Sequence, residues 1–297
     1  MFSLRQLKAF VTVAENKSFT KAAKLLYMTQ PAVSAQIKVL EERLGVQLLE
    51  RNDKNIMLTE AGRMFYDEAY KIISLHDGFI EVINELKGVR RGKLCLAAST
   101  IPGEYLLPRF IGDFSKQYPG LELTLKIADT GLVVDLLLKR AVDLGMIGAP
   151  VKDDALHLEE FVTDELIIIS AVDAIIPDVL DPVDFAEADF ILREQESGTR
   201  MVLFRKLKDY GLDPKKLHVV MELGSTRAII TAVENGLGLG VVSRIAASDA
   251  LELGKLREIK VKGLNLQRSL YLAWNKNKYQ SFGIKAFLKH IKTFKNC

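Results

Sequence analysis

Residues 18–62 read SFTKAAKLLYMTQPAVSAQIKVLEERLGVQLLERNDKNIMLTEAG. This stretch predicts a short helix at residues 19–26, a turn at residues 27–29, and a second helix with Pro31 in its first turn. Gly45 stands where a glycine commonly ends a helix. Two helices joined by a tight turn of this kind form a helix-turn-helix, whose second helix enters the major groove of DNA.

The helix starts carry N-cap residues. Ser18 is suited to cap the first motif helix, and either Thr29 or Gln30 is suited to cap the second. After the second helix, the turn-forming residues 52–55 lie between two apolar runs, which predicts a two-stranded wing. The region is therefore expected to be a winged helix-turn-helix.

A long helix is predicted after the wing, capped by Thr59 and continuing to about residue 88. Its apolar seam, with one histidine, alternates steps of four and three residues. The seam consists of Phe65, Ala69, Ile72, His76, Phe79, Ile83 and Leu86. This heptad rhythm favours pairing with a second copy, and packing on its own domain is the alternative. Residues 88–92 are expected to form a hinge.

The polar side of the second motif helix is the predicted DNA-contacting surface. Val33, Ile37, Leu40 and Leu44 recur at helical spacing and predict the buried side. The candidate DNA-binding residues on the other side and in the wing are Thr29, Gln30, Pro31, Ser34, Ala35, Lys38, Arg51 and Lys54. Gln30 can make two hydrogen bonds to an adenine edge, and the basic members suit phosphates. For any one of them, a solvated helix face is the alternative.

Charge and composition agree with this assignment. The chain has a net charge of +3, and residues 1–58 carry nine Lys and Arg against five Asp and Glu, as a phosphate-binding surface requires. The first residues, MFSLRQLKAFVTVAENK, show no apolar core of a signal peptide. Cys95 and Cys297 are the two cysteines of the chain and suit a reducing cytosol. A cytoplasmic location without membrane association is expected.

From Gly92 onward, short apolar runs alternate with helical patterns, which predicts an α/β fold with parallel strands. Strands are expected at residues 93–98, 121–128, 144–147, 166–171, 190–192, 217–221, 239–242 and 269–274, with a closing helix at 279–291. Ligands of open α/β sheets bind at the carboxyl ends of strands, and helix N-termini bind anions.

Small hydroxyl residues stand at these strand-to-helix turns. The candidate effector-binding residues are Ser99, Thr100, Thr130, Ser197, Gly198, Thr199, Ser225 and Thr226. Their convergence predicts a site for a small anionic molecule, whereas ordinary N-capping is the alternative for each one singly. Arg200 either adds positive charge to that site or is a structural ion-pair partner.

The N-terminal motif resembles that of the LysR-type transcriptional regulators, and the similarity covers essentially the whole chain. The matching residues are Phe19, Ala22, Ala23, Leu26, Thr29, Gln30, Pro31, Ala32, Ser34, Gln36, Ile37, Leu40, Glu41, Leu44, Gly45, Leu48, Arg51, Leu58, Thr59 and Gly62. Ala35 departs from the pattern, because many members carry arginine there. A contact made by that arginine in relatives is absent here.

The resemblance implies three parts. Residues 1–58 form the winged helix-turn-helix, residues 59–92 the linker and dimerisation helix with its hinge, and residues 93–297 an effector domain like a periplasmic solute-binding protein. Its two lobes are expected at about residues 93–162 with 269–297, and at about residues 163–268.

The resemblance also implies partners. These are promoter DNA, a second dimer in a homotetramer, RNA polymerase and a small-molecule co-inducer, with no other cofactor. A weaker resemblance, carried by residues 99–108 and 193–200, points to a branch associated with sulfur or selenium metabolism. It implies a small oxyanion or a sulfur metabolite as the effector.

An enzyme and an exported solute-binding protein are the competing hypotheses. The run GLGLG at residues 236–240 precedes a predicted strand, whereas a dinucleotide-binding loop follows one. The four histidines show no metal-binding spacing, and neither a P-loop nor a nucleophile elbow is present. A solute-binding protein would need an export signal and would leave residues 1–58 without a role. We therefore expect no enzymatic activity and no metal.

Overall fold

The computed structural model describes residues 2–52, 55–87, 91–195 and 197–294. The chain forms two compact units, one of Met1–Val89 with Lys139–Ala141 and one of Arg90–Leu138 with Val142–Cys297. The first unit contains the helix-turn-helix and the long helix, and the second contains the α/β region.

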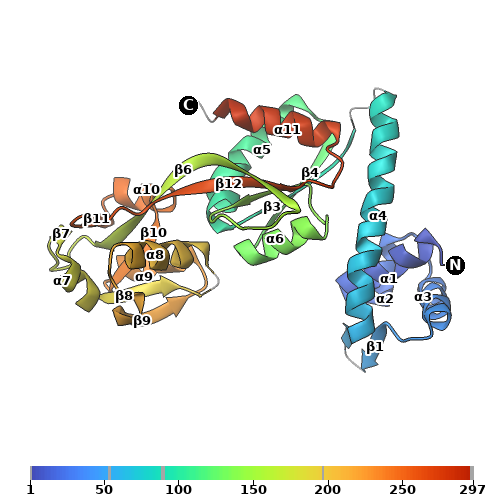
Figure 1. The fold of residues 1–297 in the computed structure, drawn as a ribbon, viewed down its shortest axis with the longest axis horizontal. Coiled ribbons are helices and arrows are strands. Elements are labelled where there is room, and N and C mark those ends of the chain that lie inside the picture. The colour runs from blue at the N-terminus through green and yellow to red at the C-terminus, as the bar shows by residue number, and fades with distance from the viewer. Residues whose placement is uncertain (1, 53–54, 88–90, 196, 295–297) are drawn as a thin grey trace. The chain divides into compact units, whose positions relative to one another are not determined.

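The first unit has the predicted order of helices and wing strands (Figure 1). Its elements are α1 (Leu4–Asn16), α2 (Phe19–Leu25), α3 (Gln30–Leu44), β1 (Leu49–Asn52), β2 (Asn55–Leu58) and α4 (Glu60–Leu86). The side chain of Ser18 accepts from the backbone N–H of Lys21, and that of Thr29 accepts from Ala32. Gly45 ends α3 with a left-handed φ of 69°. Local capping therefore sets the helix boundaries, and α2 ends one residue earlier than predicted.

The wing is tied to the helices by side chains and by close backbone packing. Glu41 Oε1 accepts hydrogen bonds from the backbone N–H groups of Leu48, at 2.8 Å, and Leu49, at 3.1 Å. Thr59 Oγ1 accepts from the N–H of Gly62 at 2.8 Å and so caps α4, as predicted. A Cβ at Gly62 would lie 2.0 Å from the carbonyl oxygen of Leu48. The glycine is required because the α4 backbone touches the entry to the wing.

The predicted seam of α4 divides into two parts. Phe65 packs edge-on against Phe10 of α1, with ring centroids 5.5 Å apart, and Ala69 is buried in the same core. For these two residues the prediction of a pairing surface was wrong, because the first turns of α4 complete the core of their own domain. Farther along, Ile72, Phe79 and Ile83 are exposed. Pairing through this second part stays a prediction.

The second unit is a two-lobed α/β structure. Its first lobe contains β3 (Gly92–Ala98), the π-helix η1 (Pro102–Leu106), α5 (Leu107–Gln117), β4 (Leu121–Ile127), α6 (Thr130–Leu138), β5 (Leu144–Ile147) and α11 (Phe282–Thr293). Its second lobe contains β7 (Val179–Leu180), α7 (Pro182–Glu187), β8 (Asp189–Arg193), α8 (Gly198–Asp209), the 3-10 helix η2 (Pro214–Lys216), β9 (His218–Leu223), α9 (Thr226–Glu234), β10 (Leu239–Ser243), α10 (Arg244–Glu252) and β11 (Leu256–Val261).

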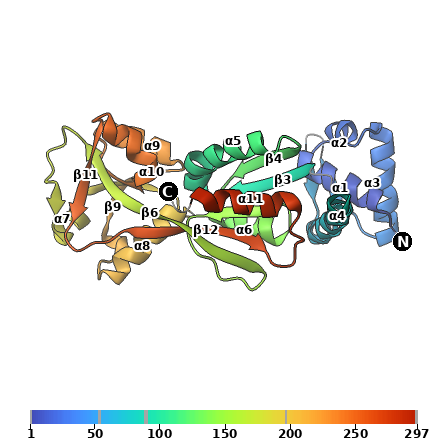
Figure 2. The same cartoon turned by 90° about the horizontal axis from the view of Figure 1, so that it is seen from above.

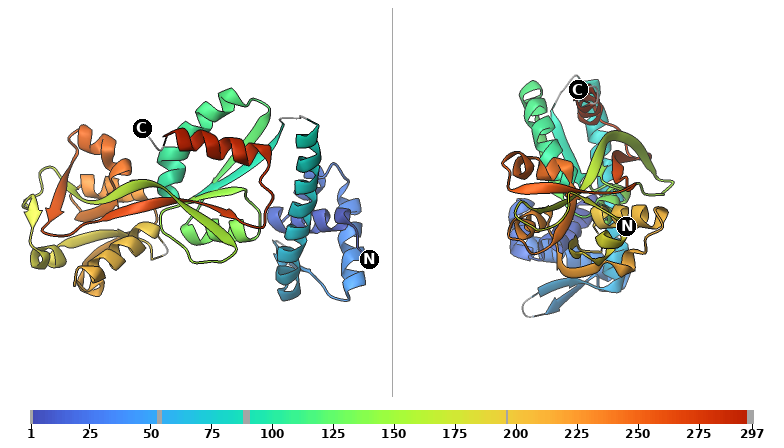
Figure 3. Two further views of the ribbon diagram at one scale, coloured as in Figure 1. Left: turned by 45° about the horizontal axis from the view of Figure 1, so that its top comes forward. Right: turned by 90° about the vertical axis from the view of Figure 1, so that its left-hand side faces the viewer.

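Two long antiparallel strands, β6 (Leu156–Ala171) and β12 (Gln267–Asn275), connect the lobes (Figures 1 and 3). The strand order is β4-β3-β5-β12-β6-β10-β8-β9, with β11 also paired to β6. The predicted parallel pairing is confirmed within each lobe, for β3 with β4 and β5 and for β8 with β9 and β10. The sheet therefore continues from one lobe to the other through the crossover strands.

Each lobe has helices on both faces of its part of the sheet. Leu94 and Leu96 of β3 pack in the core of α5 and α11, whereas Ala97 packs against α6. In the same way, Leu166 of β6 packs in the core of α8, and Ile167 packs in the core of α9 and α10. Figure 2 shows α9 and α10 on one side of the second lobe and α8 on the other. The alternation of side chains in a strand produces these two layers.

Candidate functional site

The predicted DNA-contacting side of α3 is largely exposed. Thr29, Gln30, Pro31, Ala35 and Lys38 are exposed, whereas Ser34 is half-buried. On the core side, Val33, Ile37 and Leu40 are fully buried as predicted, whereas Leu44, the last residue of α3, is half-buried.

The structure describes the side chain of one of the three basic candidates, Lys38, but not the side chains of Arg51 and Lys54. Lys38 Nζ lies 3.8 Å from Glu42 Oε1, and both side chains are well exposed, so this ion pair is weak and leaves Lys38 accessible. The backbone of Arg51 pairs with that of Ile56 in the wing. The side chain of Arg51 and all of Lys54 lie outside the described residues.

Six of the eight predicted effector residues line one cavity between the two lobes. They are Ser99, Thr100 and Thr130 from the first lobe, and Ser197, Gly198 and Thr199 from the second. The cavity measures about 20 Å³, which is room for about one water molecule. Ser225 lines an adjoining pocket of about 280 Å³, together with Thr100. Thr226 lines neither, because its buried hydroxyl accepts a hydrogen bond from Arg193.

Helices from opposite lobes begin at the cavity. Thr130 is the first residue of α6, and Gly198 is the first residue of α8. A Cβ at Gly198 would lie 3.2 Å from Thr130 Oγ1, so the two helix starts approach closely. Backbone N–H groups at helix N-termini favour negative charge. The arrangement provides an anion-favouring environment from both lobes at once.

Two arginines at the cavity were not among the predicted effector residues. Arg193, at the end of β8, donates from Nη1 to Thr226 Oγ1 at 2.7 Å and makes a two-pronged ion pair with Glu194. Arg268, near the start of β12, lines the same cavity and is almost fully buried. The position of Arg193 at a strand's carboxyl end is a signal that could have identified it. Nothing local in the sequence indicates Arg268.

Each of these arginines has a carboxylate partner. Arg193 lowers the pKa of Glu194 through their hydrogen bonds. Burial lowers the pKa of Arg268, while Asp164 opposes that shift. Arg268 Nε donates to Asp164 Oδ2 at 2.8 Å, and Nη1 donates to Thr199 Oγ1 at 3.4 Å. The cavity is therefore rich in donors, although both guanidinium charges are already balanced.

Of the two roles expected for Arg200, the structure shows the structural ion-pair partner. It donates from Nη1 to the backbone carbonyl of Arg193 at 2.8 Å, forms an ion pair with Glu222, and lies over the ring of Phe204. It lines a different pocket, formed mainly by residues of α8, η2 and β9, and not the cavity between the lobes. Its charge supports the second lobe instead of the predicted anion site.

The glycine-rich run has the conformation expected from the sequence. The glycine-rich run at residues 236–240 makes the turn from α9 to β10, with a φ of 75° at Gly236. Among the described residues, no group of three or more His, Cys, Asp or Glu side chains is placed to hold a metal ion. The described helices also include none that is both long and apolar enough to span a bilayer.

Comparison with known proteins agrees with this architecture. Residues 4–63 match the family model for the bacterial regulatory helix-turn-helix protein of the lysR family, and residues 87–295 match the LysR substrate binding domain. A probable RuBisCO transcriptional regulator from Phaeodactylum tricornutum is 33% identical over 99% of this chain and 98% of its own length.

Two solved structures are similar in fold. A full-length OxyR variant from Pseudomonas aeruginosa has a TM-score of 0.77 at 21% identity, covering 98% of this chain and 95% of its own. The CcmR regulatory domain of Synechocystis, solved in complex with 2-PG (2-phosphoglycolate), has a TM-score of 0.63 at 26% identity. That match covers 69% of this chain and 98% of the CcmR domain.

The two family models together span most of the chain, and the relative is named as a transcriptional regulator, which agrees with the expectation that the chain is not an enzyme. The predicted winged helix-turn-helix and two-lobed α/β effector domain are confirmed. The chain belongs to the LysR family of DNA-binding transcriptional regulators.

Proposed function

We propose that this regulator reads promoter DNA with the exposed side of α3 and senses a small anionic metabolite at the cavity between its lobes. Ser99, Thr130 and Thr199 would hold the anion together with Arg268, and Arg193 would form a wall of the adjoining pocket. Because the cavity has room for about one water molecule, a carboxylate or phosphate requires its walls to move apart. That movement is the event that would reach the DNA-binding unit.

The observation that carries the proposal is a buried hydroxyl without a hydrogen-bond partner, beside a buried guanidinium. Within the part of the chain that the structure describes, Thr130 Oγ1 is buried and has no hydrogen-bond partner, whereas Arg268 Nη2 is buried in an ion-pair contact with Asp164 Oδ2 at 2.6 Å. Both residues line the same cavity. An unmatched buried donor costs about 1–3 kcal/mol. A ligand that brings several acceptor oxygens would remove this cost, and an oxyanion is the simplest such ligand.

The relatives support the chemical class of the ligand. The CcmR regulatory domain was solved with 2-PG, a small molecule that carries a phosphate and a carboxylate. We propose 2-phosphoglycolate as the first probe for this chain. Sulfate serves as the second probe, because the weaker resemblance to a sulfur or selenium branch remains a prediction.

Calorimetry on the full chain tests the site. We expect 2-phosphoglycolate or sulfate to bind the wild-type protein, and Ser99→Ala combined with Thr199→Val to weaken that binding at least about tenfold through the loss of two hydroxyl donors. Operator affinity in the absence of the probe should persist. If the double variant bound the probe as the wild type does, the ligand would lie elsewhere.

A matched control uses the same two substitutions away from the cavity. Ser115 bonds to the carbonyl of Ile111 within α5, and Thr231 is exposed on α9. Ser115→Ala with Thr231→Val should leave probe affinity unchanged within about twofold. A loss in this control equal to the loss in the cavity variant would indicate a general effect on folding.

Self-association and contact with the transcription machinery complete the proposal. The exposed Ile72, Phe79 and Ile83 of α4 would pair with a second copy, and two dimers would form the homotetramer. RNA polymerase is the proposed partner at the promoter, and the cytoplasm is the proposed location because the protein acts on DNA. Sedimentation of the full chain, compared with a Phe79→Glu variant, tests the pairing surface.

A further inference from the structure

Asp164 and Arg268 form a buried ion pair between the two strands that connect the lobes. Their side chains are 0% and 3% exposed, and the residues are direct partners in the register of β6 and β12. We infer that Asp164 is a built-in counter-anion of the effector site. It holds Arg268 when no effector is bound and opposes the binding of an anionic effector. This inference rests on the proposed function, because it concerns the same site.

The guanidinium of Arg268 lies between Asp164 and the cavity. On one side Nε donates to Asp164 Oδ2 at 2.8 Å, and Nη2 makes an ion-pair contact with the same oxygen at 2.6 Å. On the other side Nη1 lies 3.4 Å from Thr199 Oγ1 and 3.4 Å from the place of a Cβ at Gly148. A single guanidinium is therefore shared between an internal carboxylate and the predicted anion site.

Asp164 acts on the cavity only through Arg268. It is not one of the residues that line the cavity. Its second oxygen, Oδ1, accepts the hydroxyl of Ser243 at 2.7 Å, and Ser243 ends β10 in the second lobe. Both carboxylate oxygens therefore have donors, and they anchor Arg268 to the second lobe. Asp164 is a positioning residue and not a ligand of the effector.

The same pair links the site to the crossover. Asp164 belongs to β6 and Arg268 to β12, which are the two strands that run from one lobe to the other. An anion that draws Arg268 toward the cavity loosens its bond to Asp164. Effector binding would thus weaken a side-chain bond between the two strands that connect the lobes.

The electrostatic consequence follows from burial. In a low-dielectric interior, a carboxylate near a guanidinium cancels much of the attraction that the guanidinium exerts on an incoming anion. An anion and Asp164 also repel each other across the guanidinium. Removing the charge of Asp164 while keeping its shape should therefore strengthen anion binding, although it leaves Arg268 unpaired and weakens the ligand-free fold.

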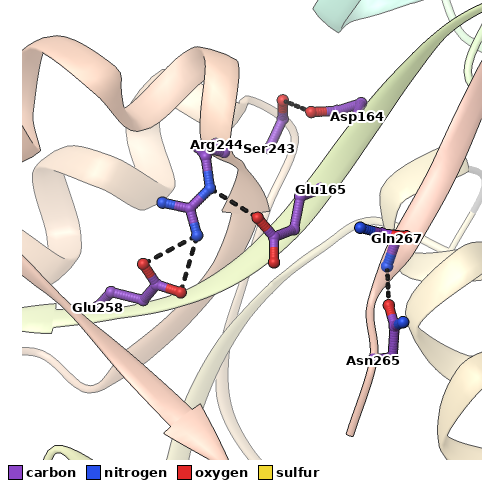
Figure 4. A network of polar contacts seen from close by, with 7 residues as sticks. All are labelled: Asp164, Glu165, Ser243, Arg244, Glu258, Asn265 and Gln267. Atoms are coloured by element: carbon purple, nitrogen blue, oxygen red, sulfur yellow. Dashed lines mark hydrogen bonds and ion pairs between the residues drawn. The ribbon is translucent and has the colours of Figure 1, made fainter.

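The neighbouring carboxylate provides a matched control. Glu165 follows Asp164 in β6 but bonds to Arg244, at 2.7 Å from Nε, and Arg244 also bonds to Glu258 (Figure 4). Figure 4 shows Asp164 directed to Ser243 and Glu165 directed to Arg244. Glu165→Gln changes the net charge as much as Asp164→Asn does, without touching Arg268.

The test is calorimetry of the full chain with 2-phosphoglycolate, or with sulfate if that is the probe that binds. Asparagine retains an acceptor for Arg268 Nε, so Asp164→Asn should bind the probe about tenfold more tightly than the wild type. Its melting temperature without probe should be lower, and the probe should raise it more than in the wild type. Glu165→Gln should change probe affinity by less than about twofold.

A second variant, Ser243→Ala, should change the affinity for the probe in the opposite direction to Asp164→Asn. Ser243→Ala removes the other donor to Asp164, so the carboxylate then depends on Arg268 alone, and probe affinity should fall about threefold. If Asp164→Asn does not fold, the probe affinity of Ser243→Ala tests the inference.

Equal or weaker binding by Asp164→Asn, or unchanged binding by Ser243→Ala, would overturn the inference. A wild type that binds neither probe would overturn the proposed function and the inference together, whereas a wild type that binds with unresponsive variants would overturn the inference alone.

Discussion

The DNA-binding unit and the proposed effector cavity differ in how far apart their residues lie in the sequence. The exposed side of α3, from Gln30 to Lys38, lies within a single helix. The cavity is assembled from Ser99, Thr130, Thr199 and Arg268, which come from separate elements of both lobes and a crossover strand. The first site depends on local structure and the second depends on the relation between lobes.

This difference separates sequence signals that act within one helix from features that depend on residues far apart in the chain. Caps, a terminal glycine and helical spacing act within about one helix and are readable residue by residue. The cavity needs a β-sheet that crosses twice between lobes. Substitutions in the two regions should therefore have separable effects, and each of the following variants tests that separation.

The largest effect is expected for Arg268→Gln. It leaves Asp164 as an unpaired buried charge and removes a donor from the cavity, so we expect a stability loss of about 3–5 kcal/mol in the regulatory domain. Binding of the anionic probe should be lost, whereas binding of the operator by the helix-turn-helix should persist. Chemical denaturation measures the stability, calorimetry measures the binding of the probe, and a gel-shift assay measures the binding of the operator. Unaltered stability would contradict the buried pair's role.

A smaller and strictly local effect is expected for Gln30→Ala. Loss of a two-pronged contact to one base should cost about 1–3 kcal/mol at the cognate site and relax preference at one position. Probe affinity should not change. Competition binding with single-base operator variants provides the measurement. Equal weakening on unrelated DNA would show that Gln30 does not read a base.

The smallest effect is expected for Arg51→Ala in the wing. A phosphate contact contributes to all DNA sequences alike, so binding should weaken uniformly and the salt slope should fall by about 1. A titration of DNA affinity against salt concentration measures the slope. Lys17→Ala, at the end of α1 and outside the wing, is the control and should leave the slope unchanged. An identical slope for Arg51→Ala and wild type would remove Arg51 from the phosphate contacts.

Much of the fold was predictable because its signals are local. Ser18, Thr29 and Gly45 cap the helices as expected, and the strand at residues 144–147 was predicted with its observed bounds. The crossover strand β6 was predicted over residues 166–171 only, although it begins at Leu156. Its first part, LHLEEFVTDE, is rich in polar residues and lacks the apolar run that marked residues 166–171 as a strand. β11, Leu256–Val261, was missed altogether.

The candidate site was predictable in part for a related reason. Hydroxyl residues after strands mark places where helices begin, so Ser99, Thr130 and Thr199 could be identified one by one. Thr226 has the same signal, yet its hydroxyl accepts a hydrogen bond from Arg193 and does not line the cavity or the adjoining pocket. Local sequence cannot separate these two outcomes, because they depend on which side of the strand end faces the other lobe.

The amino-acid sequence by itself determined the molecular class, the order of domains and the exposed side of α3 that we propose contacts DNA. Those features follow from capping, periodicity and charge within short segments. Only the tertiary structure decided that Arg268 meets Asp164 across two strands and reaches the cavity, and that Arg200 does not. The physical reason is that a buried charge is stabilised by whichever partner the sheet brings beside it, and β6 and β12 bring together residues more than a hundred positions apart.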